Sequence, residues 1–239
     1  MAQNIYDKEE FFEGYSRLAR SKGGLAEAPE WPTVQSFLPE LADLKILDLG
    51  CGFGAFDRWA IEQGARSVVA VDLSEKMLVE ARDRTDTDRI LYVRGDLTEL
   101  DAFPDDFDLI YSALAFHYVA DVQNLFLALR KHLCDGGSIV ASVEHPIYTA
   151  PSNPKWKSGP CWPLDGYFHE GQRVTNWITD GVVKYHRTVT TYMRCLLAAN
   201  FTIRNFSEWA PTADDLERHP EWTSELHRPM FLIFGADAT

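Results

Sequence analysis

Short apolar runs alternate with segments of helical periodicity along residues 45–143. Residues 45–49 form an apolar run that ends at a cluster of glycines, and apolar side chains then recur at helical spacing from Phe56 to Ala60. Residues 67–71 form a second apolar run, and Ser74 after it can cap a further helix. This order predicts a strand, a tight turn, a helix and a second strand.

Further apolar runs at residues 90–93, 107–111 and 138–143 continue the alternation. Between the last two, a helix pattern begins after Asp121 and places leucines on one face. Helical connections of this length join parallel strands through right-handed crossovers. We therefore expect an α/β fold with a doubly wound sheet.

The pattern changes after residue 144, because five prolines between residues 146 and 163 disfavour regular helix. Two strand-like arms, residues 173–179 and 182–187, flank Asp180-Gly181, a sequence typical of a two-residue type I′ hairpin. We expect residues 146–187 to form a cap above the sheet. The aromatic side chains of this segment could be a lid over a site or a small core of the cap itself.

The end of the chain predicts a helix over residues 188–199 and two strands over residues 201–209 and 230–234. A turn-rich connection joins these last strands, which favours antiparallel pairing. No repeat or linker divides the 239 residues, so we expect a single domain spanning residues 1–239.

The composition of the chain limits the classes of partner that the protein is expected to bind. The chain has 23 Lys and Arg against 36 Asp and Glu, and its net charge of −13 opposes binding to nucleic acid or to an anionic membrane. The beginning of the chain is charged and no long apolar stretch follows, which predicts a cytoplasmic protein. Cysteine, histidine and acidic residues lack the spacing of a metal site, so we expect no metal.

Three glycines, Gly50, Gly52 and Gly54, follow the first predicted strand, at the sheet edge where open α/β folds bind ligands. Glycine lets the backbone approach a ligand closely. Asp72 directly follows the second strand and can accept hydrogen bonds from ribose hydroxyls. The sequence thus predicts a nucleoside site, and the same glycines also fit an NAD(P)-dependent oxidoreductase.

The run KILDLGCGFGAF, together with Asp72, Asp96-Leu97 and YSALAFHYV, resembles class I S-adenosylmethionine-dependent methyltransferases over residues 45–143. The segments YSRLARSKGGL and EWP, and the tail, are similar to the small-molecule branch of that family. The resemblance implies a Rossmann-like, seven-stranded, mostly parallel sheet whose last strand is antiparallel. It also implies a helical segment, residues 1–40, over the cofactor S-adenosylmethionine. The expected reaction is methyl transfer to an O, N or C nucleophile of a small-molecule acceptor.

The resemblance also implies roles for individual residues. Asp72 would bind the ribose, Leu73 would cover one face of the adenine, and Asp96 would accept from its amino group. Tyr15 and Arg20 would close over the methionine carboxylate, although Arg20 can equally be a surface residue. The residues implied to contact the cofactor are Tyr15, Arg20, Gly50, Cys51, Gly52, Asp72, Leu73, Met77, Asp96, Leu97, Ser112 and Ala113.

Methyl transfer from a sulfonium needs positioning above all, and a base only where the acceptor must lose a proton. Three histidines lie where such a base could act, His117 and His145 after strands and His186 in the cap. We expect His132, like His219 and His227, to lie on the surface. We expect Glu144 to face water at the end of its strand.

Two alternatives to the methyltransferase remain open at this point. One is the nicotinamide-dependent oxidoreductase, which lacks support because no Tyr-x-x-x-Lys pair is present. The other is a non-catalytic module that binds a nucleoside or a partner. The sequence leaves the oligomeric state undetermined.

Overall fold

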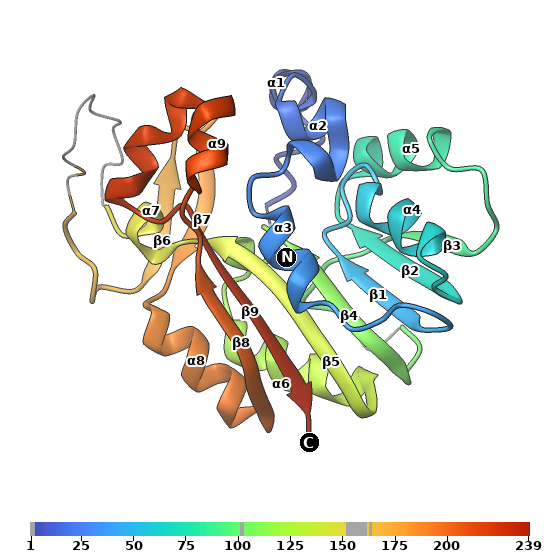
Figure 1. Ribbon diagram of the computed structural model, residues 1–239. Helices are drawn as coiled ribbons and strands as arrows, with labels where there is room; N and C mark the ends of the chain where they lie inside the picture. The colour runs from blue at the N-terminus through green and yellow to red at the C-terminus, as the bar shows by residue number, and fades with distance from the viewer. Residues whose placement is uncertain (1–2, 101–102, 152–161, 163) are drawn as a thin grey trace.

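Seven strands form one sheet in the order β3-β2-β1-β4-β5-β9-β8 (Figure 1). The structure is a computed structural model that describes residues 3–100, 103–151, 162 and 164–239. The strands are β1 (Lys45–Leu49), β2 (Ser67–Asp72), β3 (Ile90–Arg94), β4 (Phe107–Ala113), β5 (Leu133–Glu144), β8 (Phe201–Glu208) and β9 (Phe231–Ala238). The first five pair in parallel, while β9 runs antiparallel to both β5 and β8. The predicted α/β sheet with an antiparallel last strand is confirmed.

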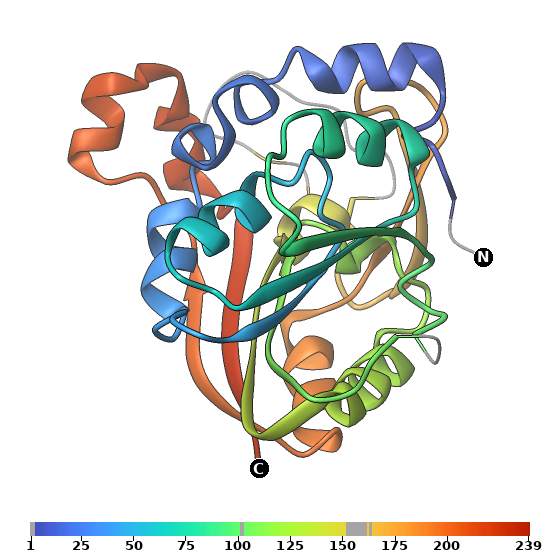
Figure 2. The same ribbon diagram turned by 90° about the vertical axis from the view of Figure 1, so that its right-hand side faces the viewer.

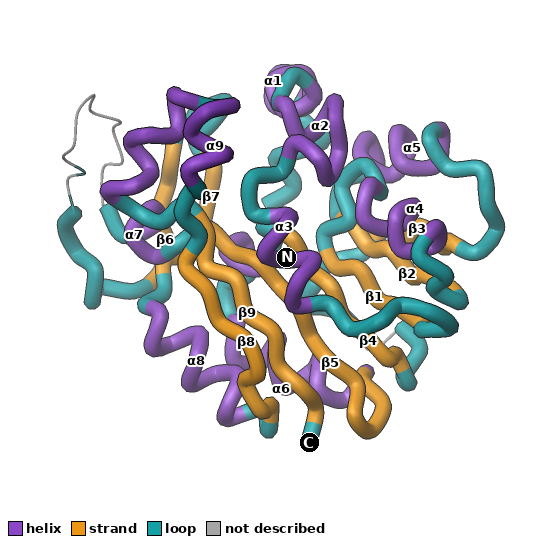
Figure 3. The backbone as a smooth tube through the Cα atoms, in the orientation of Figure 1, coloured by secondary structure: helices purple, strands orange, loops and turns teal. Residues whose placement is uncertain are grey.

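Helices cover both faces of the sheet, as Figures 1 and 3 show. Neighbouring residues of β1 face opposite sides, so Leu47 packs with α6 and α8, whereas Ile46 packs with α3, α4 and α5. The helices of the two layers are α3 (Trp31–Phe37), α4 (Ala55–Glu62), α5 (Glu75–Asp83), α6 (Val122–His132) and α8 (Val189–Ala198). Every helix of the described residues is too short or too polar to span a bilayer.

Side-chain caps fix where these helices begin. The side chain of Ser74 accepts a hydrogen bond from the backbone N–H of Met77, and that of Asp121 accepts from Asn124. Both helices therefore start at the residues that the sequence indicated. Thr188 caps α8 in the same way.

The N-terminal segment lies over the carboxyl ends of β1 and β2. It contains α1 (Glu9–Ser16), α2 (Ala19–Gly23) and the 3₁₀ turn η1 (Gly24–Glu27) before α3. In Figure 2 these blue helices run across one end of the sheet. The sheet edge that carries the glycine loop is therefore covered by the beginning of the chain.

The chain after β5 forms a short helix, α7 (Pro146–Thr149), and then a separate two-stranded sheet of β6 (Gly171–Thr175) and β7 (Val182–His186). The prolines did not exclude helix entirely, because Pro146 occupies the first turn of α7, where proline is tolerated. The remaining elements are η2 (Phe116–Tyr118), α9 (Ala213–Arg218) and η3 (Pro220–His227). Trp156, one of the aromatic residues expected in a lid, lies outside the described residues.

The predicted two-residue hairpin turn at Asp180-Gly181 is wrong. The last ladder pair joins Thr175 to Val182, so the connection comprises residues 176–181. Trp177 in this loop packs edge-on against the rings of Phe11 and Tyr15, 5.6 and 6.2 Å away between ring centroids. These tertiary contacts with the N-terminal segment outweigh the local preference for a tight turn.

Candidate active site

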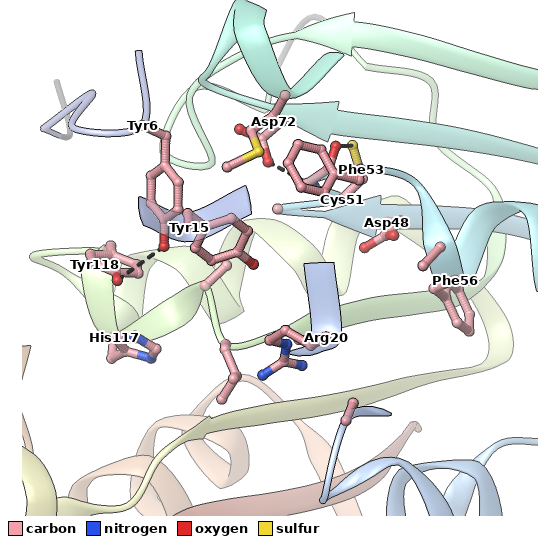
Figure 4. A pocket seen from close by; sticks show the side chains of 18 of the residues that line it. Tyr6, Tyr15, Arg20, Asp48, Cys51, Phe53, Phe56, Asp72, His117 and Tyr118 are labelled. Atoms are coloured by element: carbon pink, nitrogen blue, oxygen red, sulfur yellow. Dashed lines mark hydrogen bonds between the residues drawn. The ribbon is translucent and has the colours of Figure 1, made fainter. Parts of the chain in front are cut away.

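A cavity of about 430 Å³ lies at the carboxyl ends of β1, β2, β4 and β5, beneath the N-terminal helices (Figure 4). Its floor is the glycine loop after β1, and its walls include residues of α1, α2, α3, η2 and the β6–β7 loop. Parallel strands end together at this edge, so side chains from distant parts of the sequence meet here.

The glycine loop presents bare backbone to the cavity. Gly50 has φ +85°, and a Cβ added there would lie 2.5 Å from the Cβ of Ala115, so a side chain cannot fit. Gly52 has φ +53° and would meet nothing within 4 Å, which means that its missing side chain leaves room for a ligand. Asp72 holds the loop in place, because one carboxylate oxygen accepts from Gly52 N (2.9 Å) and the other from Ser74 N (2.9 Å).

The part of the cavity next to β2 and β3 combines two carboxylates with apolar walls. Asp72 and Asp96 line it, together with Leu73, Met77 and Leu97. Asp96 also accepts two hydrogen bonds from Thr98, which fix its orientation. Carboxylates can accept from ribose hydroxyls and from an exocyclic amine, and the apolar side chains can cover a flat base.

Arg20 lies in the cavity wall rather than on the surface. Its guanidinium donates to Glu30 Oε1 at 2.7 Å, and the Glu30 side chain is almost fully buried. The other oxygen of Glu30 is buried without a partner among the described residues. Arg20 and Tyr15 line the same cavity, which puts a cation and a hydroxyl where a ligand carboxylate could bind.

The charges in the cavity distinguish the candidate ligands. In the part of the chain that the structure describes, five carboxyl side chains (Glu30, Asp48, Asp72, Asp96 and Glu144) and one arginine line it. Burial raises the pKa of Asp48 well above its ordinary value and also raises that of Asp72, but the carboxyl groups of the described lining still outnumber Arg20, which is paired with Glu30. A pyrophosphate would be repelled here, whereas a sulfonium with a nucleoside and one carboxylate fits.

Known proteins support this interpretation. Residues 47–141 match the family model for a methyltransferase domain. A crystal structure of an S-adenosylmethionine-dependent methyltransferase from Mesorhizobium loti is 49% identical, with a TM-score of 0.85, over 90% of this chain and 100% of that one. The chain belongs to the S-adenosylmethionine-dependent methyltransferases. An uncharacterized protein of Haemophilus influenzae is 35% identical over 98% of this chain and 96% of its own length.

Membership of this family decides between the two cofactors that the glycine pattern left open. The methyltransferase uses S-adenosylmethionine, and the oxidoreductase alternative no longer applies. The expected cofactor-contacting residues line the cavity, with the exception of Ser112. Ser112 is fully buried and donates to the carbonyl of Leu49 at 2.7 Å, tying β4 to β1. Successive residues of a strand face opposite sides, so Ala113 reaches the cavity and Ser112 does not.

Of the three candidate histidines, the structure brings only His117 to the cavity. His145 caps α7 through Nδ1 and contacts Glu208 through Nε2 at 2.7 Å. His186 is buried between the hydroxyl of Thr149 and the carbonyl of Tyr167, each 2.8 Å away. Both of these side chains connect parts of the fold, and neither is near the cofactor residues.

His132 is not on the surface as expected. It is 5% exposed, and its Nδ1 lies 3.2 Å from the carbonyl of Pro104 and 2.8 Å from a carboxylate oxygen of Asp105. The loop before β4 covers the end of α6, and no pattern in the sequence indicates that contact.

The part of the cavity next to β4 and β5 contains polar residues that the sequence did not indicate. We expected Glu144 to face water at the end of its strand, but its side chain lines this part of the cavity. Its carboxylate accepts from Lys184 Nζ at 2.5 Å. The hydroxyl of Tyr6 donates to that of Tyr118 at 3.1 Å (Figure 4). Tyr118 belongs to the YSALAFHYV run and Glu144 ends β5, whereas Tyr6 and Lys184 come from the N-terminal segment and β7, for which the sequence gave no signal.

Proposed function

We propose that the methyltransferase transfers a methyl group to a nucleophile of a small-molecule acceptor bound beside β4 and β5. The observation that carries this is the aromatic lining of that part of the cavity. Aromatic side chains of Tyr118, Tyr148 and Trp177 line it, together with Tyr6 and Tyr15 of the N-terminal segment. A small molecule fits such a space, and a folded macromolecule does not.

In this proposal the cofactor occupies the β1–β3 side, with Asp72 at its ribose, Asp96 at its adenine and Arg20 at its carboxylate. S-adenosylmethionine supplies an activated methyl group, so the protein contributes positioning and exclusion of water. The aromatic rings favour a sulfonium through cation–π attraction.

We infer that His117 acts as a hydrogen-bond donor to the acceptor. Its Nδ1 accepts from the backbone N–H of Glu144 at 3.3 Å, which leaves the proton of the neutral ring on Nε2. Burial lowers the pKa of His117 to about 3; the charge of Glu144 opposes this shift, and those of Lys184 and Arg187 add to it. The ring is therefore neutral, and its Nε2–H can orient an acceptor but has no lone pair to take a proton.

The test is the size of the labelled product. Wild-type protein is incubated with methyl-labelled S-adenosylmethionine and a complete cell extract, and the extract is then separated by ultrafiltration. We expect label in the low-molecular-weight fraction. Label confined to protein or nucleic acid would contradict the small-molecule acceptor, and binding of S-adenosylhomocysteine without any labelled product would favour the non-catalytic module.

A further inference from the structure

An ion pair joins Glu144, which lines the cavity, to Lys184. Lys184 lies on β7, and its side chain is 4% exposed. Its ammonium is 4.8 Å from the ring centroid of Trp177 and 5.8 Å from that of Tyr118. Both rings line the cavity and Lys184 does not, so the cation lies behind the cavity wall while the carboxylate faces the cavity.

One oxygen of Glu144 remains available. Oε1 is held by Lys184, and Oε2 has no hydrogen-bond partner among the described residues. Burial by itself would raise the pKa of Glu144, but the charge of Lys184 and its hydrogen bond to the carboxylate outweigh burial and lower the pKa. The cavity is therefore lined by a carboxylate that Lys184 holds at Oε1 and whose Oε2 has no hydrogen-bond partner among the described residues.

The position of Glu144 separates it from the cofactor residues. It ends β5, and β1 and β4 lie between β5 and the strand that ends at Asp72. Three strand spacings amount to roughly 14 Å. Glu144 therefore belongs to the part of the cavity assigned above to the acceptor.

We propose that the acceptor is a neutral nitrogen nucleophile whose N–H donates to Glu144 Oε2, and that Lys184 is the positioning residue for this carboxylate. The proposal rests on the proposed function and adds the chemical class of the substrate. A carboxylate of low basicity is a poor base for an alcohol or a carbon acid. A neutral nitrogen needs no deprotonation before it attacks.

The nitrogen lone pair forms the new N–CH₃ bond while the C–S bond breaks, and the electron pair of that bond remains on sulfur. The nitrogen becomes positively charged beside Glu144 and the rings of Tyr118 and Trp177, which stabilise that charge. The N–H proton then passes through Oε2 to water. An anionic acceptor would be repelled by the same carboxylate.

Three probes of similar size test the substrate class. Aniline, phenol and benzoate are titrated by NMR at pH 8 into wild-type protein saturated with S-adenosylhomocysteine. We expect aniline to bind at least about tenfold more tightly than benzoate, and the Glu144→Gln variant to lose this preference. Equal or tighter binding of benzoate to the wild type would overturn the proposal.

Variants of Lys184 test its positioning role. Lys184→Arg keeps the charge and should keep the preference for aniline over benzoate. This preference is lost on acidification, when Glu144 takes up a proton. In Lys184→Met the loss should occur at a higher pH than in the wild type. Among the described residues, the titratable or charged groups around Glu144 are Lys184 on β7, His117 and Tyr118 on η2, Tyr148 on α7 and Tyr192 on α8. The control is Lys45→Met, which breaks the exposed pair with Asp106. An unchanged pH profile in Lys184→Met would contradict a positioning role.

Two further measurements separate the possible failures. Glu144→Gln/Lys184→Met removes both charges, so it should fold and bind S-adenosylhomocysteine even if Lys184→Met does not fold, and it should show no preference for aniline. A retained preference would refute the assignment. If the labelled product of the wild type is an ether or ester, the nitrogen acceptor is wrong while the small-molecule function stands. If no small molecule is labelled, the proposed function itself fails.

Discussion

Asp72 connects a local feature of the sequence to the geometry of the site. Its two carboxylate oxygens accept from Gly52 N and Ser74 N, so the residue links the glycine loop to the start of α5. Each oxygen keeps a lone pair for a ribose hydroxyl. Loss of this carboxylate should therefore affect the loop and the ligand together.

Replacing Asp72 with alanine should weaken S-adenosylhomocysteine binding by about 1–3 kcal/mol, because buried donors lose their partner. Isothermal titration calorimetry measures the change. The control is Asp43→Ala, which removes an exposed carboxylate that pairs with Arg66. Affinity equal to that of the wild type would refute the assignment of Asp72.

The buried histidines make stability depend on pH. Burial lowers the pKa of His117 to about 3, and it also lowers those of His145 and His186. The unfolded chain binds protons near the ordinary pKa of about 6.5. Between these pKa values the unfolded state holds more protons than the folded state. The contribution of the buried histidines to stability is therefore fully present above about pH 6.5 and is lost as the pH falls.

Urea unfolding of the wild type and His117→Asn between pH 6.5 and 5 measures this effect. One buried neutral histidine contributes at most about 1.4 kcal/mol per pH unit, so the variant should lose that much less stability per unit of acidification. His227→Asn, at an exposed position, should follow the wild type. Identical slopes for wild type and His117→Asn would show that His117 does not stay neutral in the folded protein.

At the level of elements, hydrophobic periodicity and capping residues were sufficient to predict the strands of the sheet and its helices. The strand at Lys45–Leu49 and the caps at Ser74 and Asp121 are where the pattern placed them, since each depends on neighbours in sequence. The β6–β7 hairpin differs from the two-residue turn that the sequence suggested, because its loop packs against α1. A turn preference of local origin is weaker than the burial of a tryptophan and its ring contacts.

Replacing residues 176–181 with Asn-Gly would impose the short turn that the sequence suggested. The contacts of Trp177 with Phe11 and Tyr15 would be lost, and the N-terminal cover would loosen. We expect S-adenosylhomocysteine to bind about 1–3 kcal/mol more weakly by calorimetry. Trp177→Phe keeps a ring and serves as the control, and unchanged binding in the short-loop variant would mean that the loop does not support the cover.

At the level of the whole molecule, ligand binding should be visible in the unfolding temperature. A ligand at a hundred times its dissociation constant stabilises the folded state by about 2.7 kcal/mol. For a domain of this size, that corresponds to roughly 5–10 °C. We expect this shift with S-adenosylhomocysteine and none with NADH in differential scanning fluorimetry. A shift with NADH alone would contradict the charge argument for the cavity.

The amino-acid sequence by itself determined the α/β class, the glycine loop and the residues around Asp72 and Asp96. These features depend on periodicity, on backbone conformations that glycine permits, and on positions directly after a strand. Each of these features depends on residues that are neighbours in the chain, so it can be predicted from the sequence.

The tertiary structure alone decided which charges meet. Lys184 contacts Glu144 across 40 residues of sequence, and Arg20 reaches Glu30 only because α2 and α3 fold over the glycine loop. Whether a histidine reaches the cavity likewise depended on how the cap packs against β5. The energy of a buried charge is set by its neighbours in space, and a linear pattern does not contain them.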